Sequence, residues 1–81
     1  MDGFDALNLL RAGESGTVSA CDAEEGIRRR LMDIGLVSGA RVDCLHKSPL
    51  GDPTAYRIFG AVIALRSEDA AHVRIRREVR P

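Results

Sequence analysis

The sequence predicts a mainly β fold: a small, partly open barrel of about five short strands, with one α-helix between the first and second strands. The chain has 81 residues, enough for a single domain, 1–81, around one small core. Only one segment repeats its apolar residues at the helical period, whereas the other apolar runs are short and follow the two-residue period of strands. Glycine and proline separate these runs, as expected for tight turns between short strands.

The helix is expected over about residues 23–34. Asp22 is placed to cap its first turn, and Glu25 stands three residues later, where it would complete a capping box. Gly35 is expected to end the helix in the left-handed conformation, with Leu36 folding back onto it in a Schellman motif. The apolar residues at helical spacing, which we expect on the core face, are Ile27, Leu31 and Ile34.

Five runs are expected to form the strands, and the first of them precedes the helix. These runs are residues 17–21, 41–47, 55–59, 62–66 and 72–76. The third and fourth runs flank Gly60 and Ala61, which fits a hairpin in which the glycine adopts a positive φ. The polar link at residues 67–71 is expected to form one turn of α- or 3₁₀-helix. The strand side chains expected in the core are Val18, Val42, Ile58, Ile63, Leu65, Val73 and Ile75.

Several residues are expected to fix turns rather than to carry chemistry. Glycine serves where a helix end or a tight turn needs backbone angles that other residues adopt only with strain. Proline restricts the backbone and removes an amide donor, so the loop between the second and third runs belongs at the surface. Leu50 is therefore expected to be exposed. The turn residues are Gly35, Gly39, Gly51, Pro49 and Pro53.

The charge pattern argues against a nucleic-acid partner. The 12 Lys and Arg residues are balanced by 12 Asp and Glu residues, whereas binding to phosphates requires a basic surplus. Residues 1–25 hold six acids and one base, and residues 26–81 hold eleven bases and six acids, so we expect the two halves to attract each other. No aromatic residues for base stacking alternate with the arginines near the C-terminus. The arginines near the C-terminus are Arg74, Arg76, Arg77 and Arg80.

The sequence also argues against membrane insertion and catalysis. No run approaches the roughly 20 apolar residues that cross a bilayer, and the N-terminus lacks a basic segment followed by an apolar one, so we expect a cytoplasmic protein. No nucleophile stands with a convincing base, and there is no phosphate-binding glycine loop, so we expect no enzyme activity. Because an incompletely closed barrel leaves strand edges exposed, homo-oligomerisation stays open.

A metal site is only weakly indicated. Cys44 and His46 would lie on one face of the expected second strand, and His72 or Cys21 would supply a further ligand. Nitrogen and sulfur ligands suit zinc better than ferrous iron, which prefers histidine with carboxylates. The two cysteines lack the paired spacing of a zinc motif. We therefore expect no resident cofactor, and at most an adventitious divalent ion.

Apolar residues near the helix exit and the proline-containing loop predict a modest protein interface. Leu36, Leu50 and Tyr56 would form an exposed apolar patch, with Leu50 the best single candidate. Asp52 and Arg66 would form its polar rim, which is the usual composition of such an interface. The alternative is that all three apolar residues complete the core.

The helix contributes a second set of candidate contacts. Residues 28–30 are all arginine, but consecutive helical residues lie about 100° apart and cannot form one stripe. Arg29 and Arg30 are candidates to meet acidic groups on a partner, and such contacts would make binding salt-sensitive.

Two motifs give the sequence a family resemblance. Residues 30–39 read R-L-M-D-I-G-L-V-S-G, and residues 49–53 read P-L-G-D-P. This ordered pair is preceded by Leu7-x-x-Leu10-x-x-Gly13 and followed by the apolar segments 63–66 and 70–75. Over about residues 6–76 the chain resembles the ferrous iron transport protein A (FeoA) family.

The resemblance implies an SH3-like barrel that acts in the cytoplasm and is not an enzyme. The family is associated with ferrous iron uptake, and its implied partner is the cytoplasmic region of the membrane transporter FeoB, which carries a GTP-binding domain. Two alternatives remain. One is a small metal-sensing barrel that uses Cys44, His46 and His72. The other, less favoured, is a nucleic-acid-binding barrel that uses the basic C-terminal half.

Overall fold

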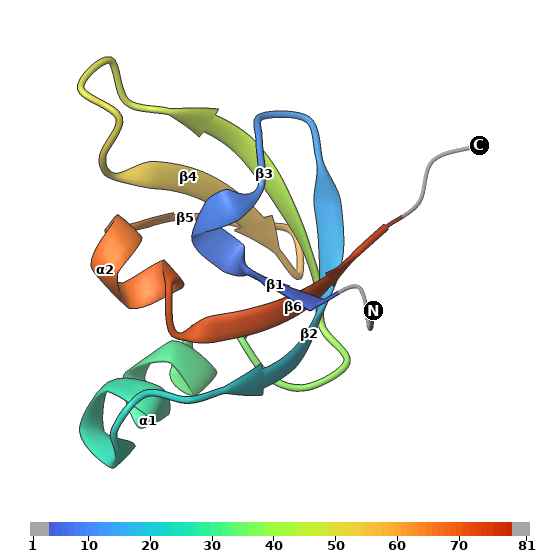
Figure 1. Ribbon diagram of the computed structural model, residues 1–81, viewed down its shortest axis with the longest axis vertical. Coiled ribbons are helices and arrows are strands. Elements are labelled where there is room, and N and C mark those ends of the chain that lie inside the picture. The colour runs from blue at the N-terminus through green and yellow to red at the C-terminus, as the bar shows by residue number, and fades with distance from the viewer. Residues whose placement is uncertain (1–3, 79–81) are drawn as a thin grey trace.

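The computed structural model describes residues 4–78, and in this part of the chain six antiparallel strands form one sheet that curls around a core (Figure 1). The strands follow the order β1-β6-β2-β3-β4-β5 across the sheet. Both α-helices lie toward the same side of the view in Figure 1. The elements are β1 (Phe4–Ala6), η1 (Leu7–Leu9), β2 (Ser15–Cys21), α1 (Glu25–Asp33), β3 (Arg41–Lys47), β4 (Thr54–Ile58), β5 (Ala61–Leu65), α2 (Ser67–Ala70) and β6 (Val73–Arg77).

The expected mainly β architecture is confirmed, with one additional strand. The five predicted runs correspond to β2–β6, and the predicted helical link is α2. The extra strand, β1, pairs with β6 over three residues, a length too short to show an alternating pattern in the sequence. The sheet leaves β1 and β5 as its two edges. The short helices η1 and α2 are in contact, and the Asn8 amide nitrogen donates to the Ser67 hydroxyl at 3.1 Å.

The core contains residues from both the N-terminal and the C-terminal parts of the chain. Leu7 and Leu10 are fully buried beside the apolar faces of the strands. Of the side chains expected in the core, Ile27 and Ile63 are only partly buried and pack against its edge. The buried cluster consists of Leu7, Leu10, Val18, Leu31, Leu36, Ala40, Val42, Cys44, Tyr56, Ile58, Leu65, Ala70, Val73 and Ile75.

The start of α1 differs from the prediction. The helix begins at Glu25, its N-cap is Glu24, and no side chain caps it. Asp22 does not act as the cap because its carboxylate binds two side chains near the start of β6. One oxygen lies 3.0 Å from His72 Nδ1, and the other accepts from Arg74 at 3.2 Å. The predicted capping box is therefore wrong.

The end of α1 follows the predicted Schellman geometry. Gly35 has φ of +106°, and its N–H donates to the Met32 carbonyl at 3.0 Å. The Leu36 N–H donates to the Leu31 carbonyl at 3.0 Å. Ile34 is exposed rather than part of the core face, because the helix ends at Asp33 and Ile34 no longer follows the helical path.

The β4–β5 hairpin turns one residue earlier than predicted. Ile58 and Ala61 are paired, so the turn consists of Phe59 and Gly60. Both turn residues have positive φ, +50° for Phe59 and +80° for Gly60, which is the signature of a type I′ turn. An aromatic residue in this conformation is unusual. The turn holds the Phe59 side chain at the surface, where it is 75% exposed.

Candidate partner-binding surface

The β3–β4 loop presents Leu50 on a well-defined turn. The Gly51 N–H donates to the Ser48 carbonyl at 2.7 Å, which closes a four-residue turn with Pro49 and Leu50 in the middle. Proline at the second position and glycine at the fourth are typical of a type I turn. The Ser48 hydroxyl also donates to the Pro53 carbonyl at 2.8 Å. As a result Leu50 is 95% exposed, as expected.

Asp52 joins this loop to the start of α2. Its carboxylate accepts from the Ser67 N–H at 2.8 Å, and Arg66 Nη1 lies 4.0 Å from the same carboxylate. The two rim residues predicted from the sequence, Asp52 and Arg66, therefore lie together. The loop that carries Leu50 is fixed to the body of the protein through this contact.

Two of the predicted surface residues, Leu36 and Tyr56, lie in the core instead. Leu36 follows the helix exit and is 1% exposed, because the Schellman turn folds it back toward Leu31. Tyr56 lies in β4 between Cys44 of β3 and Ile63 of β5. Burial raises the pKa of the Tyr56 hydroxyl to about 12. Neither residue is accessible to a partner, so the predicted three-residue patch is wrong.

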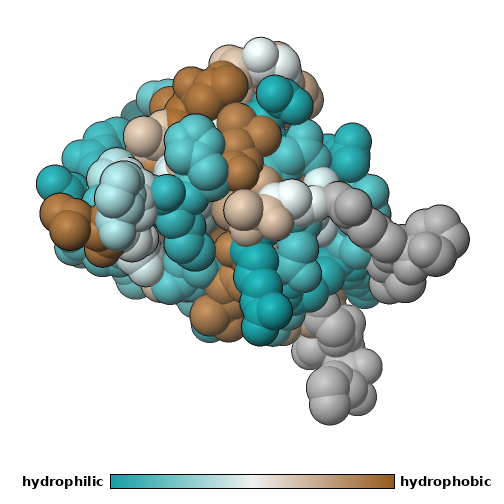
Figure 2. Space-filling model, turned by 90° about the horizontal axis from the view of Figure 1, so that it is seen from above, coloured by the Kyte–Doolittle hydropathy of each residue, from teal (hydrophilic) through white to brown (hydrophobic). Residues whose placement is uncertain are grey.

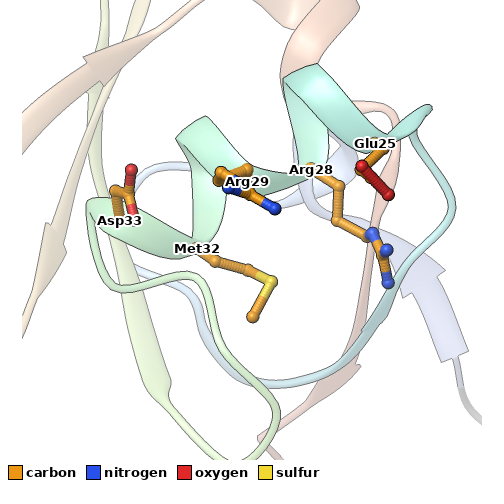
Figure 3. Close-up of a pocket in the computed structure, with 5 residues that line it drawn as sticks. All are labelled: Glu25, Arg28, Arg29, Met32 and Asp33. Atoms are coloured by element: carbon orange, nitrogen blue, oxygen red, sulfur yellow. The ribbon is translucent and has the colours of Figure 1, made fainter.

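The solvent-facing side of α1 holds a shallow hollow of about 270 Å³ (Figure 3). Met32, 47% exposed, extends from the helix into this hollow, and Arg28 extends to the same side with Glu25 next to it. Arg29 and Asp33 complete the lining. All five residues come from one helix, so this is a surface depression rather than a cleft between elements.

Arg30 faces a different and larger hollow, which confirms that the arginine run forms no single stripe. This second hollow, about 460 Å³, lies between the end of α1 and the β5–α2 corner. Arg66 lines it from the other side, so two predicted contact residues share it. No ion pair among residues 4–78 involves residues 28–30. The lining residues are Arg30, Leu31, Asp33, Ile34, Ala64, Leu65, Arg66 and Asp69.

The three candidate metal ligands are not brought together. The β3–β4 register shifts between Cys44 and His46, so the two residues do not share a face as the alternation predicted. Cys44 is buried, and this burial raises its thiol pKa, whereas His46 is exposed. His72 contacts Asp22 instead. Within residues 4–78 no group of three or more His, Cys, Asp or Glu side chains is placed to hold a metal ion.

The expected attraction between the acidic and basic parts of the chain is present as ion pairs around Arg77. Arg77 Nε lies 2.6 Å from Asp5, and Arg77 Nη1 lies 2.6 Å from Glu14. A third donor of the same guanidinium reaches the Leu9 carbonyl at 2.9 Å. The bonds to Asp5 and Glu14 raise the Arg77 pKa, with Asp5 contributing most. They tie β6 to the N-terminal segment.

The neighbouring arginines of β6 also have partners within the protein. Arg74 binds Asp22, and the Arg76 guanidinium lies 4.9 Å from the centre of the Phe4 ring. Charges engaged in this way are less available to phosphates, which weakens the nucleic-acid alternative. Arg80 lies outside the described residues.

Acidification is expected to lower the free energy of unfolding as the pH falls below about 4.5. The pKa of Glu14 lies below its ordinary 4.5, first because its carboxylate accepts from the Arg11 N–H and then because of Arg77. The pKa of Asp22 lies below its ordinary 3.8, chiefly because of its hydrogen bond with His72. The unfolded chain takes up these protons first, so it binds more protons in this range and is favoured as the pH falls.

Thermal unfolding followed from about pH 7 to about pH 3 tests this expectation. Glu14→Gln and Asp22→Asn should each flatten the decline. Glu24→Gln serves as the control, because Glu24 takes part in none of the ion pairs formed within residues 4–78. An unchanged slope in both test variants would contradict the assignment.

Several exposed apolar side chains were not predicted as surface features. Figure 2 shows hydrophobic residues in small separate patches among hydrophilic ones on the face seen from above. The sequence pattern places Phe59 and Val62 in strands and Ile34 in the core, and it does not single out Met32. For Phe59 the signal was the following glycine, because a residue before glycine at a hairpin corner often belongs to the turn. Within residues 4–78 the exposed large apolar residues are Phe4, Leu9, Met32, Ile34, Leu50, Phe59 and Val62.

The family model described as the FeoA domain matches residues 6–77. The chain is 30% identical over 69 residues to an Fe(2+) transport protein A/Fe(2+) transporter FeoB fusion protein of Porphyromonas gingivalis. This match covers 85% of the chain but only 8% of the fusion protein. Among residues 4–78, no helix is long and apolar enough to span a membrane.

Solved structures agree with this match. An FeoA-like protein from Clostridium acetobutylicum is 28% identical, with a TM-score of 0.90 and coverage of 100% of this chain and 94% of the other. FeoA from Stenotrophomonas maltophilia, described as a prokaryotic SH3 domain protein complexed with zinc, is 30% identical. Its TM-score is 0.75, and the match covers 85% of this chain and 86% of that one.

The curled antiparallel sheet around one small core defines an SH3-like domain. The family match extends over nearly all of this domain. The chain belongs to the FeoA family, which is linked to ferrous iron transport.

Proposed function

We propose that this protein is a cytoplasmic accessory protein of ferrous iron uptake that binds the cytoplasmic region of an FeoB-type transporter. The Porphyromonas gingivalis fusion protein carries the argument, because one chain there joins transport protein A to the transporter FeoB. Fusion keeps the two sequences close to each other at a high effective concentration. Separate chains achieve this proximity by binding.

The β3–β4 loop is the best-supported contact surface. Leu50 is the most exposed large apolar side chain of the described residues, and its turn is closed by hydrogen bonds. Because the backbone of the turn is already held by these hydrogen bonds, binding has little loop ordering to offset, so more of the burial energy of Leu50 contributes to affinity. Asp52 and Arg66 supply the polar rim that accompanies such an anchor.

Arg30 and Arg66 extend this surface with positive charge. They lie on opposite sides of the hollow between α1 and β5, and Arg30 takes part in no ion pair within residues 4–78. Cations at the edge of an interface accelerate association with an acidic partner and make it sensitive to salt. Arg29 faces the other hollow on α1 and would contribute only to long-range attraction.

The protein acts on its partner through binding and not through chemistry of its own. A ligand shifts a conformational equilibrium only when it binds one state more tightly than the other. Any effect on GTP hydrolysis therefore requires a different affinity for the nucleotide states of the transporter. Measuring affinity in each nucleotide state reveals whether such an effect exists.

Replacing Leu50 with glutamate is expected to weaken this binding at least tenfold, which corresponds to about 1.4 kcal/mol. The charge would have to be desolvated at the centre of the contact. Titration calorimetry of the chain into the purified FeoB cytoplasmic region of the same organism, with GTP, with GDP and without nucleotide, measures the change. Met32→Glu, on the exposed face of α1, is the matched control and should bind like the wild type.

Two outcomes would contradict the proposal in different ways. Loss of binding in Met32→Glu but not in Leu50→Glu would move the contact surface to α1. No binding in any nucleotide state would reject the proposed partner.

A further inference from the structure

The outer edge of β5 lacks the features that usually protect an exposed strand edge. β5, Ala61–Leu65, contains no charged residue and no proline. Its pairing with β4 is regular over all five residue pairs, whereas the β2–β6 and β3–β4 pairings each contain a register shift. Natural edge strands are usually short, charged, bulged or interrupted by proline, because open N–H and C=O groups otherwise pair with other chains.

The opposite edge of the sheet is protected. β1 is only three residues long, and its central residue, Asp5, is held by Arg77 at 2.6 Å. The Arg76 guanidinium lies over the ring of Phe4. The contrast between the two edges marks β5 as the edge suited to pair with another strand.

The hairpin geometry identifies which backbone groups point outward. In a two-residue hairpin the pair that flanks the turn is a hydrogen-bonded pair, and hydrogen-bonded and non-hydrogen-bonded pairs then alternate. The flanking pair here is Ile58 and Ala61. Ile63 therefore faces β4 with its N–H and C=O, whereas Val62 and Ala64 direct theirs to the open edge. Val62 is 60% exposed.

An exposed aromatic ring lies at one end of this edge and a hollow at the other. At the turn end, Phe59 projects with 75% of its surface exposed. At the other end, Ala64, Arg66 and Asp69 form one wall of the hollow of about 460 Å³ beside α1. An aromatic ring that fills a pocket is the usual anchor of a protein interface.

We propose that two copies of this chain pair through β5, antiparallel, about a two-fold axis at Ile63. This register places Val62 opposite Ala64 of the second copy, so that each residue can exchange both backbone hydrogen bonds with the other. It also directs Phe59, in the turn before β5, past the Leu65 end of the second copy's β5 and toward that copy's hollow. The same contact occurs twice, as in any interface with two-fold symmetry.

A second copy suits this edge because the edge is complementary to itself. Antiparallel pairing of two identical strands brings like charges together wherever the strand is charged, and Ala61–Leu65 carries none. Reversal of direction brings the projecting ring of one copy to the hollow of the other. Five residues and one ring bury less than the roughly 800 Å² per partner of a stable complex, so the dimer is weak and depends on concentration.

Sedimentation velocity of the full chain from about 0.01 mM to about 1 mM is expected to show a monomer–dimer equilibrium. Val62→Lys should abolish the dimer, because two charges would lie next to the axis. Phe59→Ala leaves the paired edge intact and should raise the dissociation constant at least tenfold. Leu50→Lys places the same charge at an exposed apolar position outside β5, and this variant should dimerise like the wild type. Circular dichroism of each variant confirms that it is folded.

Amide exchange measured at the two ends of the same concentration range gives an independent readout. Val62 and Ala64 should become protected as the concentration rises, whereas Ile63 should not change because its N–H already faces β4. A chain that stays monomeric throughout would overturn the proposal. So would a dimer that is unaffected by both Val62→Lys and Phe59→Ala, or one that is lost in Leu50→Lys.

Discussion

Replacing Leu36 with alanine is expected to destabilise the protein by about 2–5 kcal/mol, the usual cost of truncating a buried leucine. Leu36 is 1% exposed and belongs to the buried cluster, where the helix exit folds it back toward Leu31. Removing three carbon atoms there leaves a cavity that a small core fills only partly. Urea unfolding followed by circular dichroism measures the loss.

Leu50→Ala is the matched control for this experiment, because it makes the same chemical change at a side chain that is 95% exposed. Its stability should stay within about 0.5 kcal/mol of the wild type. The pair also separates folding from binding. Leu36→Ala should reduce stability and leave the affinity of the folded protein for its partner unchanged, whereas Leu50→Ala should reduce affinity alone. If Leu36→Ala instead reduced affinity without reducing stability, Leu36 would be a surface residue.

Replacing Gly35 with alanine is expected to cost about 2–5 kcal/mol through two separate effects. Gly35 has φ of +106°, where a residue with a Cβ atom is strained by about 1–2 kcal/mol. A Cβ at this position would also lie 2.8 Å from Ile58 Cγ2 and 3.1 Å from Phe59 Cδ2, so the β4–β5 hairpin would have to shift. Overpacking of this kind costs about 1–3 kcal/mol.

Two further glycines separate the contributions of strain and collision. Gly39 has φ of +91° but nothing within 4 Å of an added Cβ, so Gly39→Ala should cost only the backbone strain, about 1–2 kcal/mol. Gly26 lies in α1 with open space around it, so Gly26→Ala should stabilise by up to about 1 kcal/mol. The urea midpoints of the three variants rank these effects on stability. Equal effects at Gly35 and Gly39 would show that the contact with the hairpin carries no energy.

Features of the fold that neighbouring residues encode were predicted correctly. The wrong predictions concern features that depend on contacts between distant segments. The end of α1 is encoded in adjacent residues, Gly35 and Leu36, and it was predicted correctly. The start of α1 was not, because the expected cap, Asp22, binds His72, which lies 50 residues further along the chain. The strand β1 is too short for an alternating pattern, and only its pairing with β6 reveals it.

The candidate site shows the same difference between locally encoded features and features that depend on strand pairing. Leu50 was predicted to be exposed because Pro49 and Gly51 encode its turn locally. The burial of Tyr56 depends on pairing on both sides of β4, although its alternation with Arg57 was a signal for the inward face. The shift that separates Cys44 from His46 is an irregularity of the paired strands, and the sequence of β3 alone does not reveal it.

The central claim is that this FeoA-family protein binds an FeoB-type transporter through the β3–β4 loop. The most direct measurement is an NMR titration of the ¹⁵N-labelled chain with the unlabelled cytoplasmic region of the transporter, in each nucleotide state. We predict saturable shifts that centre on residues 50–52 and on Arg66, next to the loop. Shifts confined to the exposed face of α1, or no shifts in any nucleotide state, would contradict the claim.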